Sequence, residues 1–261
     1  MVPILITGGG GRLASELLPL LEHASAPTRD ELDVTEPEQV DAAVAALAAR
    51  ASEHDEAIVV HTAAYTDVSG AERERDACWR VNVLGTRHVA QACAARGALL
   101  VHISTDYVFP GDTDPERSSR GGYREDDPTG PTRNHYAHTK LLAEAEARIA
   151  PRHLVIRTSF RPREWPYPTA FTDVRTSQAY VDELAPELAR AILMAPRLVD
   201  QGVHTLHVAG EPTSVYDLAR RRKPDVRPAS KAEAGVDLPD DVVLCTELWR
   251  RLRGDGAEGA G

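Results

Sequence analysis

Tyr136 and Lys140 are separated by three residues at the start of a segment that is typical of a helix. On a helix, this spacing places both side chains on one face, one turn apart. An ammonium group beside a phenol stabilises the tyrosinate and lowers the phenol pKa, so the tyrosine can exchange a proton with a substrate oxygen during hydride transfer. The pair predicts a proton-transfer site, although this spacing alone also arises by chance.

Four glycines precede another helix-like segment near the start of the chain. Gly8, Gly11 and Ala14 fit a Gly-x-x-Gly-x-x-Ala pattern: Gly8 permits a tight turn, Gly11 lets a pyrophosphate approach the backbone, and Ala14 allows close helix–strand packing. Free N–H groups and the helix dipole favour an anion here. A glycine run alone also fits a flexible turn, but its place after an apolar strand favours dinucleotide binding.

The residue that reads the adenosine ribose is expected about 20 positions beyond the glycines. Arg29 would pair with a 2′-phosphate, whereas Asp30 or Asp33 would accept a hydrogen bond from a free 2′-hydroxyl and repel the phosphate. Arg12 and Arg29 together form a basic pair in an acidic chain, which favours NADP(H), with NAD(H) as the alternative. Solvated surface arginines explain the same two residues equally well.

The elements that would position these groups alternate between strand-like and helix-like patterns. Strands are predicted at residues 2–7, 57–61, 98–104 and 154–158, with a poorly marked one at 23–29. Helices are predicted at residues 13–21, 36–50 with Thr35 as a cap, 71–96 and 136–149. This alternation predicts an α/β fold with a Rossmann-type, doubly wound parallel sheet.

The rest of the chain is less regular. Residues 106–134, rich in Pro, Gly and charge, predict a functional flap or a mobile surface loop. A helix at 180–194, a strand at 203–208 and a basic helix at 214–222 predict a small C-terminal lobe. The predicted domains are a Rossmann domain at 1–159, a small substrate-binding lobe at 160–253 interleaved with the Rossmann core, and a disordered tail at 254–261.

Composition excludes several function classes. The 261 residues are 42% apolar and 27% charged, enough for one large α/β domain or two modest ones. The net charge of −10 has the wrong sign for a general nucleic-acid binder. Apolar runs are too short for a membrane span, and the start of the chain lacks an export signal. Three cysteines without metal-ligand spacing predict neither disulfides nor a metal site, which fits the cytoplasm.

Taken together, these residues resemble the extended short-chain dehydrogenase/reductase superfamily and, within it, the dTDP-4-dehydrorhamnose reductase family. The resemblance covers the first 160 residues and returns faintly near residues 176–180 and 207–210. It rests on the glycine loop with residues 32–35 downstream, on residues 63–72, 81–83, 104–111 and 157–159, and on residues 134–136 running to Lys140 and Glu144.

The resemblance implies a catalytic group. Thr105 would hydrogen-bond the substrate carbonyl, Tyr136 would donate the proton, and Lys140 would tune Tyr136 and hold the nicotinamide ribose, while hydride from the reduced cofactor attacks the C4 ketone of a nucleotide-linked 6-deoxyhexose. Apart from Tyr136 and Lys140, the residues expected at the cofactor are Gly8, Gly10, Gly11, Arg12, Leu13, Arg29, Asp33, Val34, Ala63, Ala64, Tyr65 and Asn82. Those expected at the substrate are Thr66, Asp106, Tyr107, Phe160, Arg161 and Arg163.

Two of these assignments have a competing structural interpretation. Asn82 suits a hydrogen-bonding role beside a helix kink better than a role as a reactant. Tyr107 fits a core aromatic nearly as well as a residue that borders the sugar.

The chain also departs from the family pattern. It has His61 where the family usually has Asn, Ala14 in place of Gly, and Phe160 in place of Trp. Residues 161–172 replace a longer family segment that includes a helix of the substrate lobe, so the resemblance does not fix the substrate. Here Trp165 and Tyr167 suit stacking on a base or sugar, and Arg161 and Arg163 suit a diphosphate. A shortened edge loop that packs its aromatics on the core is the alternative.

Three functions from different classes fit these residues. The first is a reductase of a 4-keto nucleotide sugar. The second is an epimerase or dehydratase that recycles its cofactor, although only Asp106 follows Thr105 where a dehydratase usually has a carboxylate pair. The third is a non-catalytic, NADP-binding regulatory subunit, as in the methionine adenosyltransferase β-subunit, which resembles the same family. The expected partner is a small nucleotide-sugar substrate, with no nucleic acid or membrane, and a homodimer is compatible with the sequence.

Overall fold

A computed structural model describes residues 2–52 and 55–254. Six strands form one parallel sheet in the order β10–β5–β4–β3–β1–β2. They are β1 (Ile4–Thr7), β2 (Ala24–Ser25), β3 (Ile58–His61), β4 (Leu99–Thr105), β5 (His153–Thr158) and β10 (Thr205–His207). The predicted strands are confirmed, and the poorly marked one is reduced to two residues at the sheet edge.

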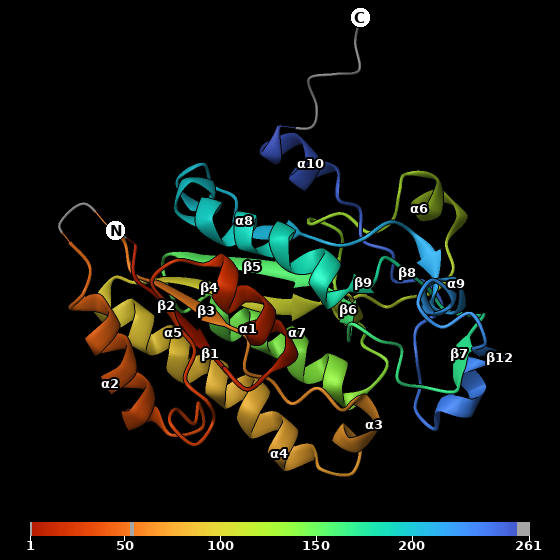
Figure 1. Ribbon diagram of the computed structural model, residues 1–261, viewed down its shortest axis with the longest axis horizontal. Helices are drawn as coiled ribbons and strands as arrows, with labels where there is room; N and C mark the ends of the chain where they lie inside the picture. Colours follow the sequence, from red (N-terminus) through yellow and green to blue (C-terminus); the bar gives the residue numbers. More distant parts are fainter. Residues whose placement is uncertain (1, 53–54, 255–261) are drawn as a thin grey trace, which may run out of the picture.

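Helices cover both faces of this sheet, as the doubly wound fold requires (Figure 1). Alternate residues of a strand point to opposite faces, and β1 shows the division: Ile4 and Ile6 pack with α1 (Arg12–Leu17) and α8 (Val181–Asp200), whereas Leu5 packs with the other layer. That second layer contains α2 (Pro37–Ala48), α5 (Gly85–Arg96) and α7 (His135–Ala147). A 3₁₀ turn, Leu18–Leu20, completes the first predicted helix.

Two helix predictions are wrong in detail. The single helix expected at 71–96 is divided into α3 (Val68–Ala71), α4 (Arg75–Trp79), a π-helical turn (Arg80–Leu84) and α5. The π turn contains Asn82, whose buried side chain hydrogen-bonds outside the helix, and such turns accommodate one extra residue where a side chain has to reach a neighbour. Thr35 does not cap α2, because its hydroxyl donates instead to Asp33.

The C-terminal prediction also needs correction. The helix and strand expected near 180–194 and 203–208 belong to the Rossmann core and not to the small lobe: α8 buries Leu184, Leu188 and Ile192 in the core, and β10 pairs with β5.

The small lobe itself consists of short elements. They are β6 (Phe160–Arg161), β7 (Thr169–Phe171), β8 (Arg175–Thr176), β9 (Ala179–Tyr180), β11 (Thr213–Ser214), α9 (Val215–Arg220), β12 (Arg227–Ala229) and a 3₁₀ turn (Lys231–Ala234). The last helix, α10 (Glu247–Arg253), contacts β10. Apart from Gly254, the predicted tail lies outside the described residues.

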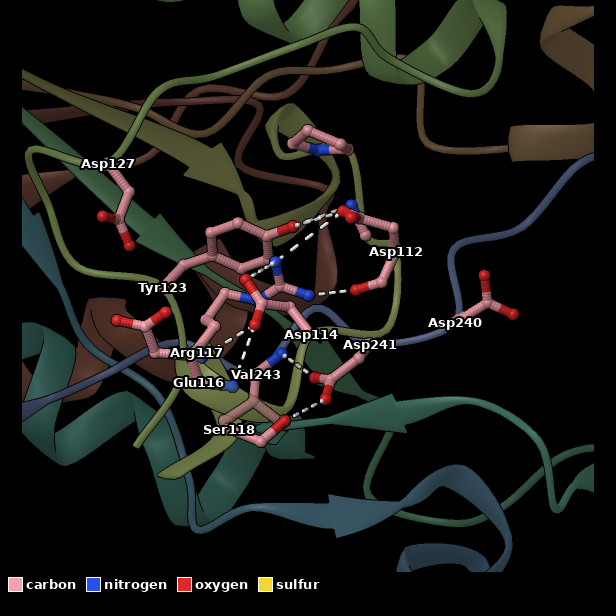
Figure 2. A network of polar contacts seen from close by, with 12 residues as sticks. Asp112, Asp114, Glu116, Arg117, Ser118, Tyr123, Asp127, Asp240, Asp241 and Val243 are labelled. Atoms are coloured by element: carbon pink, nitrogen blue, oxygen red, sulfur yellow. Dashed lines mark hydrogen bonds and ion pairs between the residues drawn. The ribbon is translucent and has the colours of Figure 1, made fainter. Parts of the chain in front are cut away.

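Residues 106–134, predicted as a functional flap or a mobile surface loop, are largely irregular and pack on another segment of the chain. They contain a 3₁₀ turn (Asp106–Val108) and α6 (Pro115–Ser119), and they pack on the segment that precedes α10. Figure 2 shows both kinds of contact: within residues 106–134 the buried Arg117 guanidinium lies 4.0 Å from the centre of the Tyr123 ring, and Ser118 donates to Asp241 of the segment that precedes α10. The Tyr123 N–H also donates to Val243 O at 2.8 Å. These charge-assisted and backbone bonds anchor the insertion away from the cavity described below.

Among residues 2–52 and 55–254, no helix combines the length and the apolar character that a membrane crossing requires.

Candidate active site

A cavity of about 820 Å³ lies at the carboxyl ends of the central strands. This is the edge at which doubly wound sheets bind ligands, because the loops after neighbouring parallel strands meet there. The structure brings most of the predicted site residues to its wall: Gly8, Gly10, Gly11, Arg12, Leu13, Arg29, Asp33, Val34, Ala63, Ala64, Tyr65, Thr66, Thr105, Tyr136, Lys140, Phe160 and Arg161. Asn82, Asp106, Tyr107 and Arg163 do not line it.

The glycine loop is held in a compact turn between β1 and α1. Gly8 has a φ of 75° and its carbonyl accepts a hydrogen bond from Gly11 N–H at 2.8 Å. A Cβ on Gly8 would lie 2.8 Å from Ala63 Cα, and one on Gly9 would lie 2.0 Å from the Ala26 carbonyl oxygen. A Cβ on Gly10 would meet open space. Glycine is therefore required at Gly8 and Gly9, and Gly9 is a position that the sequence pattern did not single out.

Arg29 and Asp33, which suggest opposite preferences for the group on the adenosine ribose, form an ion pair. Arg29 Nε donates to Asp33 Oδ2 at 3.1 Å, while Asp33 Oδ1 accepts from the backbone and hydroxyl of Thr35. These hydrogen bonds and the Arg29 charge outweigh desolvation and lower the pKa of Asp33. Because the Arg29 side chain is 75% exposed, its guanidinium remains accessible to an anion at the cavity mouth.

Helix α7 presents Tyr136 and Lys140 from its first turns, as predicted. Asn134 caps this helix by accepting from the Ala137 N–H at 2.9 Å. Further along α7, Glu144 accepts two hydrogen bonds from Arg157 of β5 and one from the Ser104 hydroxyl of β4. All three groups are buried, so this cluster fixes α7 against the sheet.

Lys140 is buried, and its ammonium group is held by β4. Nζ donates to the Ile103 carbonyl at 2.8 Å and contacts His102 Nε2 at 3.4 Å. Burial lowers the pKa of Lys140 to about 8, although the Glu144 carboxylate acts in the opposite direction. Burial and the Lys140 charge also lower the pKa of His102, so that imidazole is neutral and can accept from the ammonium.

The phenol of Tyr136 does not have the lowered pKa that its spacing from Lys140 suggested. Burial, and then the Asp106 carboxylate, raise its pKa, while the Thr105 side chain lowers it in part. The Lys140 ammonium is directed towards Ile103 and His102 instead. Before ligands bind, Tyr136 is therefore a protonated phenol, which is the form that a proton donor requires.

Thr105 ends β4 beside this phenol. Its hydroxyl donates to Asp106 Oδ1 at 2.9 Å and accepts from the Tyr107 N–H at 3.2 Å. The Tyr107 ring packs edge-on against Tyr136, with 6.3 Å between ring centres. Tyr107 is partly exposed and is not a member of the described core clusters, so its position does not match the core-aromatic interpretation, although it does not line the cavity.

Asn82 supports the cavity wall without lining it. Its buried amide accepts from the Tyr65 N–H at 2.8 Å and donates to Thr139 Oγ1 at 2.9 Å. It thereby joins the loop after β3 to α7. The structural interpretation given for Asn82 agrees with these contacts.

Comparison with known proteins decides the family. The family described as the RmlD substrate binding domain matches residues 1–161, more than half of the chain. The chain belongs to the RmlD family. A dTDP-4-dehydrorhamnose reductase from Mycobacterium tuberculosis (strain H37Rv) is 33% identical over 282 aligned positions, which cover 94% of this chain and 86% of that protein.

Two further relatives extend this family assignment. A Streptomyces antibioticus protein described as a probable dTDP-4,6-dihydroxy-2-methyloxan-3-one 4-ketoreductase is 37% identical over 223 positions, covering 83% of this chain and 64% of that protein. The crystal structure of dTDP-4-dehydrorhamnose reductase from Bacillus anthracis in complex with NADP superposes with a TM-score of 0.80 and 26% identity, covering 97% and 94% of the two chains.

In this RmlD-family cavity, the part of the wall that follows β5 separates the two arginines that the sequence grouped together. Arg161 lines the cavity, where its Nε donates to Gln178 at 2.8 Å and its guanidinium lies 5.4 Å from the centre of the Trp165 ring. Arg163 is turned away and makes a two-point ion pair with Glu16. The sequence missed this separation because Glu16 lies 147 positions earlier in the chain.

Several wall residues were not predicted, for a common reason. Most follow a strand end or flank a predicted residue, and their types carry no chemical signal of their own. They are Leu32, Thr62, Val81, Ile103, Ser104, Thr158, Ser159, Pro162 and Tyr167. Only Tyr167 had been considered, as a stacking residue, and its half-exposed ring fits that role.

Proposed function

We propose that this chain is an NADPH-dependent reductase that converts the C4 ketone of a deoxysugar nucleotide into a hydroxyl. The proposal rests on one observation: Thr105, Tyr136 and Lys140 line the same cavity as the glycine turn. Relatives over most of the chain are named as reductases of dTDP-linked keto sugars, and a similar structure contains NADP.

The cavity residues fit a dinucleotide. The turn at Gly8 exposes the start of α1, and the open space beside Gly10 leaves room for a pyrophosphate next to free N–H groups. Arg12 and Arg29 line the far end, where a 2′-phosphate would need cations. Asp33 is already hydrogen-bonded by Thr35 and paired with Arg29, so its charge opposes a phosphate less than a free carboxylate would. NADP(H) is therefore the preferred cofactor, with NAD(H) as the alternative.

When bound, the reduced nicotinamide supplies the hydride. The protein supplies orientation and the proton. Tyr136 donates its phenolic proton to the oxygen of the former ketone, Thr105 hydrogen-bonds that oxygen, and Lys140 holds the nicotinamide ribose and stabilises the resulting tyrosinate. With the Lys140 pKa at about 8, its ammonium form is present at neutral pH.

We assign to Arg161 the role of binding the diphosphate of the substrate. Arg12 and Arg29 lie on the cofactor side and Lys140 lies at the centre, so Arg161 is the cation on the substrate side of this wall. Gln178 accepts a hydrogen bond from its Nε, which leaves the two terminal nitrogens available to donate to an anion. Tyr167, half exposed at the rim, offers a ring on which the base can stack.

The test is NADPH oxidation, followed by absorbance, with dTDP-4-keto-6-deoxyglucose, its 3,5-epimerised form and other keto-sugar nucleotides. Oxidation that disappears in Tyr136→Phe is the expected result, and the best substrate identifies the sugar. Tight cofactor binding without oxidation across this panel would contradict the reductase and support a non-catalytic subunit. Product that forms without net cofactor consumption would support an epimerase or dehydratase.

Two further points stay predictions. We propose that the protein acts in the cytoplasm, which fits its three cysteines without a disulfide pattern, and a homodimer is compatible with the chain. Fractionation and light scattering test the two separately.

A further inference from the structure

Asp106 lies behind the reacting centre without lining the cavity. Its side chain is completely buried where β4 ends, and its Oδ1 accepts the hydrogen bond from Thr105 at 2.9 Å. Within residues 2–52 and 55–254, its Oδ2 has no hydrogen bond of normal geometry. A buried carboxyl with so few donors is a poor place for a negative charge, so burial shifts the protonation equilibrium of Asp106 towards the neutral acid relative to an exposed aspartate.

The charged and titratable groups around Asp106 come from three elements. Tyr107 follows it, Tyr136 faces it from α7, and the Asp106 charge raises the pKa of both phenols. From the chain after β5, Ser159 and Arg161 lie close enough to stabilise the ionised form. Burial outweighs these groups and the Thr105 hydroxyl, and it raises the pKa of Asp106 to about 6.

The hydroxyl of Thr105 has one proton to donate and two acceptor positions. An ionised Asp106 can only accept, so it takes that proton, and Thr105 has none left for a substrate carbonyl. A neutral Asp106 can donate to Thr105 Oγ1, whose second acceptor position is used by the Tyr107 N–H. The Thr105 proton is then free to point into the cavity, where Thr105 and Tyr136 both lie.

We propose that Asp106 is a positioning residue that sets the direction of the Thr105 hydroxyl, and that its neutral form is the productive one. With Asp106 neutral, Thr105 and Tyr136 both donate to the substrate oxygen as negative charge develops on it. No proton leaves Asp106 during this cycle. This inference rests on the proposed reductase function, because it assigns Thr105 a role at the substrate carbonyl.

The decisive experiment is the pH profile of kcat/KM for NADPH-dependent reduction between pH 5.5 and 8.5. The wild type is expected to lose at least about tenfold as Asp106 ionises, because a donor to the developing oxyanion is lost. Asp106→Asn carries a permanent amide donor and is expected to change by less than about twofold from pH 5.5 to pH 7.5, below the range in which Lys140 loses its proton, and to exceed the wild type at pH 8. Asp106→Ala, which has no donor, is expected to be poor at every pH.

The matched control is Asp126→Asn, which removes one exposed carboxylate from the same insertion and is expected to follow the wild-type profile. If Asp106→Asn keeps the wild-type fall with pH, the inference is wrong. It is also wrong if Asp106→Asn is no better than Asp106→Ala at pH 8, because the amide donor then contributes nothing.

A second measurement needs no substrate and separates this inference from the reductase proposal. The native carboxyl holds its proton up to pH 6, whereas the unfolded chain releases it near pH 4, so the contribution of Asp106 to stability falls as pH rises through this window. The Tm of Asp106→Asn minus that of the wild type is expected to increase from pH 4 to pH 6 and then level off. A difference in Tm that does not change with pH would contradict a neutral Asp106 carboxyl, even if reduction is observed. An increasing difference without reduction on any keto sugar would reject the reductase, and with it the role of Thr105 at a carbonyl, while the neutral state of Asp106 would stand.

Discussion

The cofactor half and the substrate half of the cavity are built by different means. On the cofactor side, the glycine loop, Arg29 and Asp33 lie within 26 residues of one another, and backbone geometry places them. On the substrate side, Arg161 is oriented by Gln178 and by Trp165, and the neighbouring Arg163 is drawn away by Glu16 of α1. Local sequence therefore determines the first half, whereas packing between distant segments determines the second.

The reacting centre, formed by Thr105, Tyr136 and Lys140, lies between the two halves. Removal of its proton donor is expected to have the largest effect on activity. Tyr136→Phe removes the proton donor but keeps the ring that packs against Tyr107. We expect kcat to fall by about 10²-fold or more, with the Kd for NADPH changed by less than about twofold. Single-turnover NADPH oxidation and fluorescence titration measure the two quantities. Near-normal turnover would show that another group supplies the proton.

The glycine loop tests whether backbone geometry fixes the cofactor half. A Cβ on Gly9 would collide with the Ala26 carbonyl, whereas one on Gly10 would meet nothing within 4 Å. Gly9→Ala is therefore expected to lower the free energy of unfolding by about 2 kcal/mol or more, because backbone has to move. Chemical denaturation measures it, and Gly10→Ala is the control for the loss of a glycine. Equal losses in the free energy of unfolding of the two variants would show that the conformational freedom of glycine causes the effect and that the close contact with the Ala26 carbonyl does not.

The same contrast explains what could be predicted from the sequence. Strand ends, the glycine turn and the placement of Tyr136 and Lys140 on one helix at the cavity follow from patterns of a few residues, and they agree with the structure. The requirement at Gly9 was missed because Ala26 directly follows a two-residue strand, β2, whose sequence carries almost no apolar signal. Likewise, α8 was assigned to the small C-terminal lobe, although it packs in the core of the sheet, because its amphipathic pattern does not say which apolar surface it covers.

Charge placement was the least predictable feature of the site. The sequence identifies Lys140 as a partner for Tyr136, but the direction of its ammonium depends on the carbonyl of Ile103 and the ring of His102 across the helix–sheet interface. Asp106 was expected to touch the substrate, and its complete burial places it behind Thr105 instead. Such orientations depend on burial, which a short sequence motif does not encode.

A pair of arginine variants tests the substrate half. Arg161→Ala is expected to raise the KM for the sugar nucleotide by about tenfold without changing the Kd for NADPH, because one charge-assisted hydrogen-bond donor to the diphosphate is lost. Arg163→Ala removes the same charge two residues away but breaks only an exposed ion pair with Glu16, so a change in KM below about twofold is expected. Similar increases in both variants would mean that net charge attracts the substrate and that the position of Arg161 is unimportant.

The smallest effect is expected at the ribose end of the cofactor half. Arg29 is exposed and already paired with Asp33, so its attraction for a 2′-phosphate is screened by water and salt. Arg29→Ala is expected to raise the Kd for NADPH by about threefold to fivefold and the Kd for NADH by less than about 1.5-fold, with the difference shrinking as salt is added. Fluorescence titration with both cofactors at low and high salt measures this. If both cofactors weaken equally, Arg29 does not read the phosphate. Arg12, which lines the same cavity, would then be the residue to test as the source of the preference for NADPH over NADH.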